Sequence, residues 1–246
     1  QWFAGFLSLR AGSHGSGAAM SGLTPFLSAL WAVVWKDLRA EWRSRELISG
    51  MLVFALLVIF IFNFALELQT GLRETVTSGV LWVTFAFAGQ LGLNRSMAVE
   101  KDRGCLDGLL LAPVDRAAIY LGKTTANLIF MLVMAAIILP VYSLLYGVNL
   151  FNPGLFLVIF LGSEGYIAVG TLLSSMAVQA RTRDILLPIL LFPVAIPVVI
   201  SAVKATSGFL AAAAWTEIQP WFTLLVTYDV VFTAIAFMVF DSVVEE

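Results

Sequence analysis

Two acidic residues stand inside apolar runs of this sequence that are long enough to cross a membrane. Each shares a helix face with small and polar side chains: Glu164 with Ala168, Thr171 and Ser175, and Asp229 with Thr233 and Ala236. A carboxyl group within a membrane can bind an ion or relay protons. It can also be protonated or hydrogen-bonded and fix the packing of two helices. The sequence slightly favours the packing role for each acid taken singly, and a shift of the last run would bring Asp229 toward the membrane surface.

A second group of residues with functional potential lies in the segment 100–123, EKDRGCLDGLLLAPVDRAAIYLGK. Leu106, Leu109 and Leu110 are spaced i, i+3, i+4 and so share one face of a short helix. Pro113 ends this helix, because proline has no amide N–H for the next turn. A helix with leucines on one face and charges on the other can fill a groove on a soluble partner. It can also lie flat in the membrane interface, and the spacing alone favours neither.

Residues for catalysis are scarce. Asp102 and Asp107-Gly108 resemble part of the acidic motif of membrane phosphotransferases, but leucines follow where further acids are needed. The single histidine, His14, and the single cysteine, Cys105, argue against a histidine metal cluster, histidine-dependent hydrolysis and an internal disulfide. The sequence has no P-loop, GxSxG or HExxH motif. We therefore expect no enzymatic site, no metal and no cofactor bound by this chain.

The composition places these residues in a membrane. Of the 246 residues, 60% are hydrophobic and 12% charged, and a soluble domain could not bury so much apolar surface in one core. The net charge of −2 gives no indication of a nucleic-acid partner. The expected fold is all-α, with an interfacial helix at about 24–46 and a single transmembrane domain over 20–246. Six runs have the length of a membrane span, at about 47–66, 77–98, 118–146, 154–178, 185–203 and 221–241.

The first predicted helix is amphipathic and carries three tryptophans on its apolar face. That face is formed by Leu27, Leu30, Trp31, Val34, Trp35, Leu38 and Trp42, and the opposite face by Lys36, Arg39 and Arg43. This pattern is typical of a helix in the membrane plane, with tryptophans at head-group depth. Glu41 and Arg45 interrupt the stripe, so we expect the chain to bend there.

Prolines distinguish the fifth span. Pro188, Pro193 and Pro197 fall within it, so it should not be a straight, uniform helix, and neighbours must satisfy the carbonyl groups that lose their donors. Pro140 is expected to kink the third span.

Basic residues indicate the orientation. With Met20 inside, eleven of them face the cytoplasm and two, Arg73 and Lys204, face outward; the eleven are Lys36, Arg39, Arg43, Arg45, Arg95, Lys101, Arg103, Arg116, Lys123, Arg181 and Arg183. This bias predicts that both ends are cytoplasmic. The outer segment 204–220 is expected to hold a short helix at the outer interface. Residues 1–19 fit a signal peptide poorly and are interpreted as a non-native or disordered extension.

The layout of one interfacial helix, six spans and a leucine-bearing first cytoplasmic loop resembles that of type-2 ABC exporter permeases. The 100–123 segment and the proline pattern LLPILLFPVAIPVVIS closely resemble the haem exporter protein B (CcmB) family, the permease of the cytochrome c maturation system. The resemblance covers about Phe26 to Phe240.

The resemblance implies a complex in the bacterial inner membrane with an ATP-binding subunit (CcmA), two membrane subunits (CcmC and CcmD) and a haem chaperone (CcmE). Haem would be the substrate of the complex, ATP would bind to the partner, and a homodimer is possible. The coupling residues would be Glu100, Asp102, Gly104, Leu106, Asp107, Leu109, Leu110 and Pro113. Alternatives are a type-2 permease for lipid, polysaccharide or drug, a secondary transporter and an assembly scaffold.

Overall fold

The computed structural model describes residues 23–67, 70–102, 116–177 and 182–243. These residues form seven helices: α2 (Leu23–Ser44), α3 (Glu46–Glu67), α4 (Thr70–Asp102), α6 (Arg116–Tyr146), α7 (Pro153–Ala177), α8 (Arg183–Leu210) and α9 (Trp215–Val243). From α3 onward, each helix is long and apolar enough to cross a membrane. The predicted all-α fold with six such helices is confirmed.

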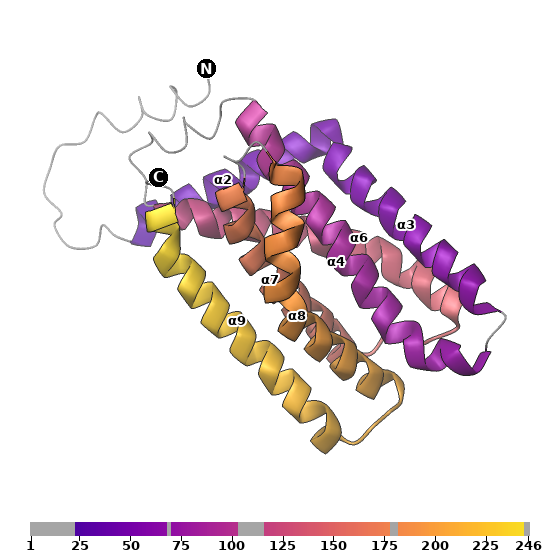
Figure 1. Ribbon diagram of the computed structural model, residues 1–246. Coiled ribbons are helices and arrows are strands. Elements are labelled where there is room, and N and C mark those ends of the chain that lie inside the picture. Colours follow the sequence, from indigo (N-terminus) through magenta and orange to yellow (C-terminus); the bar gives the residue numbers. More distant parts are fainter. Residues whose placement is uncertain (1–22, 68–69, 103–115, 178–181, 244–246) are drawn as a thin grey trace, which may run out of the picture.

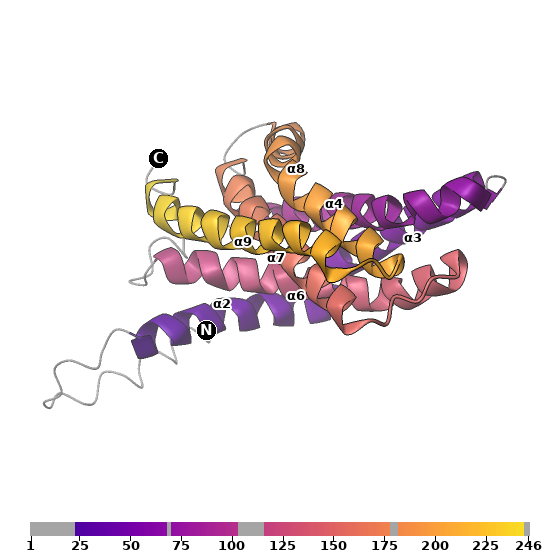
Figure 2. The same cartoon turned by 90° about the horizontal axis from the view of Figure 1, so that it is seen from below.

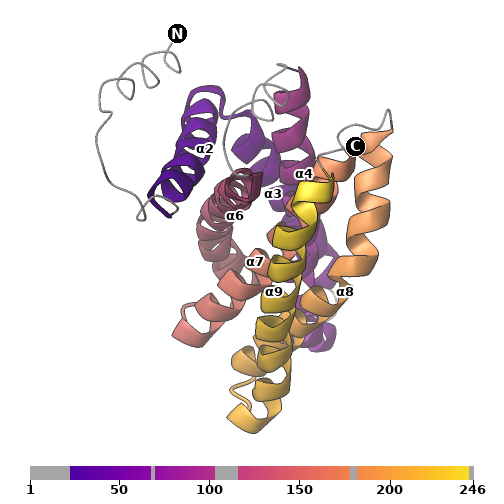
Figure 3. The same ribbon diagram turned by 90° about the vertical axis from the view of Figure 1, so that its left-hand side faces the viewer.

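The six long helices run side by side along a common direction, with α2 outside them (Figure 1). Of the six, α4 and α7 are the most buried. α7 packs against α8, α9, α6 and α4, and α4 packs against α3, α8 and α6 as well. α2 lies along α6, and both turned views place it next to that helix (Figures 2 and 3).

Tyrosines connect the helices. The hydroxyl group of each of the five tyrosines donates a hydrogen bond to a backbone carbonyl oxygen of another helix, with oxygen–oxygen distances of 2.6–3.3 Å. The pairs are Tyr120 with Ala168, Tyr142 with Thr77, Tyr146 with Ile59, Tyr166 with Ala86 and Tyr228 with Val194. A phenol suits this role because its ring packs against apolar neighbours while its hydroxyl finds a partner.

The prolines lie within continuous helices. α8 contains Pro188, Pro193 and Pro197, and α6 contains Pro140. In the section of α8 that carries these prolines, Tyr228 donates to the carbonyl of Val194, and the Ser201 hydroxyl donates to that of Pro197. Side chains thus supply hydrogen bonds to the backbone of this helix.

The prediction of a separate helix between Lys204 and Pro220 was wrong. α8 continues to Leu210 and α9 begins at Trp215, so only a short turn separates them. The Ala211 amide bonds to the Ser207 carbonyl, and Ala212 takes a positive φ of 49° that reverses the chain. Gly208 then packs against Ile218. The alanine-rich composition favours helix, but the connection is too short to hold another.

Candidate functional site

The junction between α2 and α3 is held by Glu41. Its carboxylate accepts hydrogen bonds from the amides of Ile48 (2.8 Å) and Leu47 (3.3 Å), in the first turn of α3. These amides have no partner within their helix, and the positive end of the helix dipole favours a carboxylate there. Arg45, between the helices, takes a φ of 55°. The bend predicted near Glu41 and Arg45 is therefore present, and Glu41 caps the N-terminus of α3 at this bend, which we call the elbow.

A buried ion pair joins α2 to the start of α6. The Lys123 ammonium lies 2.7 Å from the Asp37 carboxylate, and the Lys123 side chain is 4% exposed. The helices can approach so closely because residue 122 is glycine: a Cβ there would lie 2.8 Å from Val33 Cβ and 3.0 Å from the Leu30 carbonyl oxygen. Sequence reasoning counted Lys123 only as a basic residue at the membrane surface and missed this contact.

α2 therefore has an exposed apolar face and a buried face. Trp31, Trp35 and Trp42 are exposed, in agreement with the predicted apolar stripe. Val33 and Val34 are buried on the side that packs against α6. The predicted stripe placed Val34 with the tryptophans and left Val33 out, because hydrophobicity does not distinguish a lipid contact from a helix contact.

Of the predicted coupling residues, the structure describes only the first two. Glu100 and Asp102 lie in the last turn of α4, and α6 begins at Arg116. The remaining ones, from Gly104 to Pro113, lie outside the described residues. The segment that contains them is thus bounded by a central helix and by the helix that holds α2.

The two intramembrane acids, 65 residues apart in sequence, meet between α7 and α9. Asp229 Oδ1 lies against the backbone next to Glu164, at Gly165, and the Thr233 hydroxyl of α9 donates a hydrogen bond to Glu164 Oε1 at 3.1 Å. Asp229 is only 6% exposed, and within the described part of the chain no donor reaches either of its oxygens.

Gly165 makes room for this pair. A Cβ at position 165 would overlap Asp229 Oδ1 and approach Tyr228. Sequence reasoning missed this residue, although a glycine directly after an intramembrane acid is a readable signal for close helix packing.

Other polar side chains extend along the interface of α6 and α7. The Asn127 amide donates to the Thr171 hydroxyl at 3.2 Å, and the Tyr120 hydroxyl donates to the Ala168 carbonyl at 2.9 Å. Ala168 and Thr171 are on the face predicted for Glu164, so that stripe does turn inward. Such groups can hold a proton and fix helix contacts; in the described ranges, no three His, Cys, Asp or Glu residues gather as metal ligands would.

Known proteins resemble this chain over most of its length. The family model described as "CcmB protein" matches residues 28–245. Haem exporter protein B of Rhodobacter capsulatus is 29% identical over 175 residues, which are 69% of this chain and 78% of that protein. The Paracoccus denitrificans protein of the same name is 26% identical, over 74% of this chain and 84% of that protein. The one from Pseudomonas aeruginosa is also 26% identical, over 67% and 74%.

The match spans most of α2, all six long helices and the segment between α4 and α6. This chain is a multi-pass membrane protein that belongs to the CcmB protein family.

Proposed function

We propose that this chain is the permease subunit of a haem-export complex for cytochrome c maturation, driven by ATP hydrolysis in a partner subunit. The family match carries the proposal, because the matching relatives are named haem exporter protein B. The complex would lie in the bacterial inner membrane, with both ends of this chain in the cytoplasm. Its further subunits would be CcmA, CcmC and CcmD, with CcmE as the haem chaperone.

The contacts around residues 103–115 support a coupling role for that segment. α4 enters it from the centre of the bundle, and α6 leaves it toward the ion pair of Lys123 with Asp37. A force applied there would reach α7 through α4 and α6, and α2 through α6. The docking elements would be Leu106, Leu109 and Leu110, with Glu100, Asp102 and Asp107 supplying charge.

Affinity purification of the native complex in mild detergent tests the proposal. A P-loop ATPase should co-purify with this chain, and Leu109→Ala with Leu110→Ala should abolish its recovery, because a few central residues dominate such interfaces. The matched control is Leu144→Ala, an exposed leucine near the other end of α6. Wild-type recovery of the ATPase by the double variant would contradict the coupling role.

The same preparation distinguishes a transporter from a scaffold. An active permease subunit should change the ATPase rate when haem or the loaded chaperone is added. A complex that assembles fully but hydrolyses ATP independently of both would identify a scaffold.

A further inference from the structure

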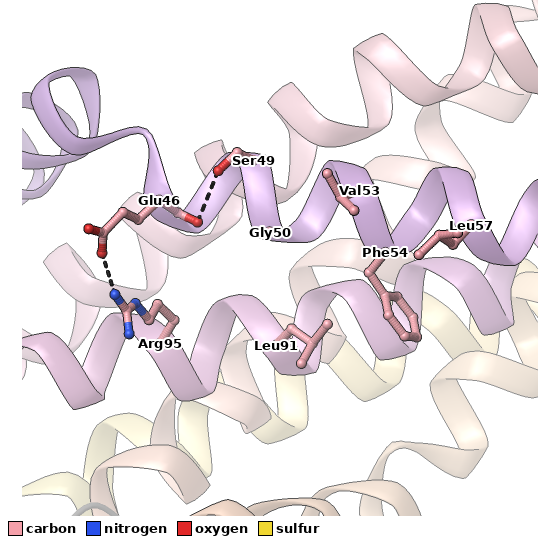
Figure 4. A pocket seen from close by; sticks show the side chains of 8 residues that line it. All are labelled: Glu46, Ser49, Gly50, Val53, Phe54, Leu57, Leu91 and Arg95. Carbon is pink, nitrogen blue, oxygen red and sulfur yellow. Dashed lines mark hydrogen bonds and ion pairs between the residues drawn. The ribbon is translucent and has the colours of Figure 1, made fainter.

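A groove lies between α3 and α4 at the surface of the bundle (Figure 4). Glu46 and Arg95 form an ion pair at one end, while Val53, Leu57 and Leu91 line the rest. Its volume is about 620 Å³, which is in the range of small-molecule sites. The groove thus has a charged end and an apolar body.

The chain's own side chains leave this groove open. Val53, Leu57 and Leu91 are 59%, 55% and 43% exposed, although all three are apolar. A Cβ at Gly50 would have no atom within 4 Å, so the space beside Gly50, near the ion pair, is not filled by other side chains. The partly buried Phe54 also lines it, and its ring centroid lies 6.2 Å from that of Phe87.

The depth of the groove matches one membrane leaflet. α3 begins at Glu46, so the ion pair lies where the span starts, at the end of the bundle where α2 joins. Leu57 follows eleven residues later, a distance of about 16 Å at 1.5 Å per residue. That is about half of the roughly 30 Å of hydrocarbon in a bilayer.

The charges favour a head group that carries both signs. The guanidinium of Arg95 has five N–H donors, of which one nitrogen bonds to Glu46, and both side chains are more than half exposed. A phosphodiester can accept from the remaining donors of Arg95, while a primary ammonium can donate to Glu46. An anionic head group, or the two propionates of haem, would meet the Glu46 carboxylate as a like charge.

We propose that the α3–α4 groove binds one phospholipid with an ethanolamine head group, from the leaflet on the α2 side. Its phosphate contacts Arg95, its ammonium contacts Glu46, and one acyl chain lies along Val53, Leu57 and Leu91. A choline head group has no N–H to donate and binds less well. This site is independent of the haem-export proposal.

Lipid titration of the purified full-length chain, followed by native mass spectrometry, tests the proposal. Ethanolamine, choline and glycerol phospholipids with identical acyl chains are compared. One ethanolamine lipid should bind about tenfold more tightly than the glycerol lipid, because a charge-assisted hydrogen bond is replaced by a repulsion. Glu46→Gln should remove this preference while leaving the protein folded.

Two glycines supply a matched pair of variants. Gly50→Leu places a side chain in the groove, and Gly79→Leu places the same side chain in open space, sixteen residues before Arg95 on α4. Both remove a helical glycine, which favours the helix. Gly50→Leu should lower the affinity for the ethanolamine lipid at least about tenfold, because a filled pocket excludes its ligand. Gly79→Leu should keep the wild-type affinity.

Equal affinity for the three lipids would show nonspecific lipid contact and overturn the proposal. Wild-type binding by Gly50→Leu would overturn it too, as would haem displacing the ethanolamine lipid from the groove. None of these results bears on ATPase recovery, which tests the proposed function separately.

Discussion

The Lys123 ammonium lies 2.7 Å from the Asp37 carboxylate, and this contact ties the first turns of α6 to the middle of α2. Neither residue belongs to the predicted coupling residues between Glu100 and Pro113, yet the pair links α6, the helix after them, to α2. In a buried pair, each charge is tolerated because the other is present.

Loss of one member of this pair should therefore destabilise the protein. Lys123→Ala removes the buried partner of Asp37 and leaves only the more exposed Lys36 ammonium, 3.3 Å from the same carboxylate, so it should lower the free energy of unfolding by up to about 3 kcal/mol. Lys123→Met with Asp37→Leu should recover most of it, because apolar groups can replace a buried pair. Thermal unfolding in detergent measures both; a double variant no more stable than the single one would contradict a pairwise role.

The elbow should depend on the capping oxygens of Glu41. Glu41→Ala removes the acceptors for Leu47 and Ile48 and should cost about 1 kcal/mol. Glu41→Gln keeps one acceptor oxygen and should fall between this variant and the wild type. Hydrogen exchange at the amides of residues 47 and 48 provides a local measurement, since it should accelerate in the order wild type, Gln, Ala. Unchanged exchange in Glu41→Ala would rule out the cap.

Gly165 should be intolerant of a side chain because of Asp229. Gly165→Ala forces a methyl group against the buried carboxyl and should destabilise the protein by about 1–3 kcal/mol. Gly79→Ala, with open space around the new Cβ, is the control and should be neutral or slightly stabilising. Combining Gly165→Ala with Asp229→Ala removes the overlap, so the pair of changes should cost less than the sum of the two single ones. Strict additivity in thermal unfolding would show that the two sites do not meet.

Orientation can be probed at Cys105, the single cysteine of the chain. The distribution of Lys and Arg predicts that this residue faces the cytoplasm. A membrane-impermeant maleimide should spare it in intact spheroplasts and label it in inverted vesicles. Labelling from the periplasmic side would reverse the orientation and remove the basis for coupling.

Haem ligation is expected to belong to a partner subunit. Of the methionines that could act as axial ligands, Met131 and Met134 are buried in the core, while Met176 is 47% exposed. Methionine usually pairs with histidine in ligating haem iron, and the single histidine, His14, is in the segment interpreted as an extension. Haem titration of the chain beginning at Met20 should give no sharp, stoichiometric Soret shift. Such a shift, abolished by Met176→Leu, would disprove the prediction.

The sequence by itself determined the membrane class, the six spans and the presence of a helix before them. These follow from the length and period of apolar runs, which are local properties of the chain. The tryptophan stripe of α2 was predictable for the same reason. The 100–123 segment and the fifth-span prolines also pointed to the family, and the family match covers both.

The tertiary structure alone decided which polar residues meet. The approach of Asp229 to Gly165 and the hydrogen bond from Thr233 to Glu164 depend on α7 lying beside α9, and hydropathy does not specify which spans are neighbours. The burial of Lys123 likewise depends on α2 packing against α6, since the same lysine on an isolated helix would extend to the membrane surface. The short turn after Leu210 was decided by the packing of α8 on α9, which local alanine content does not encode. In a membrane, apolar helices gain little from association as such, so small residues and polar contacts between spans determine the arrangement.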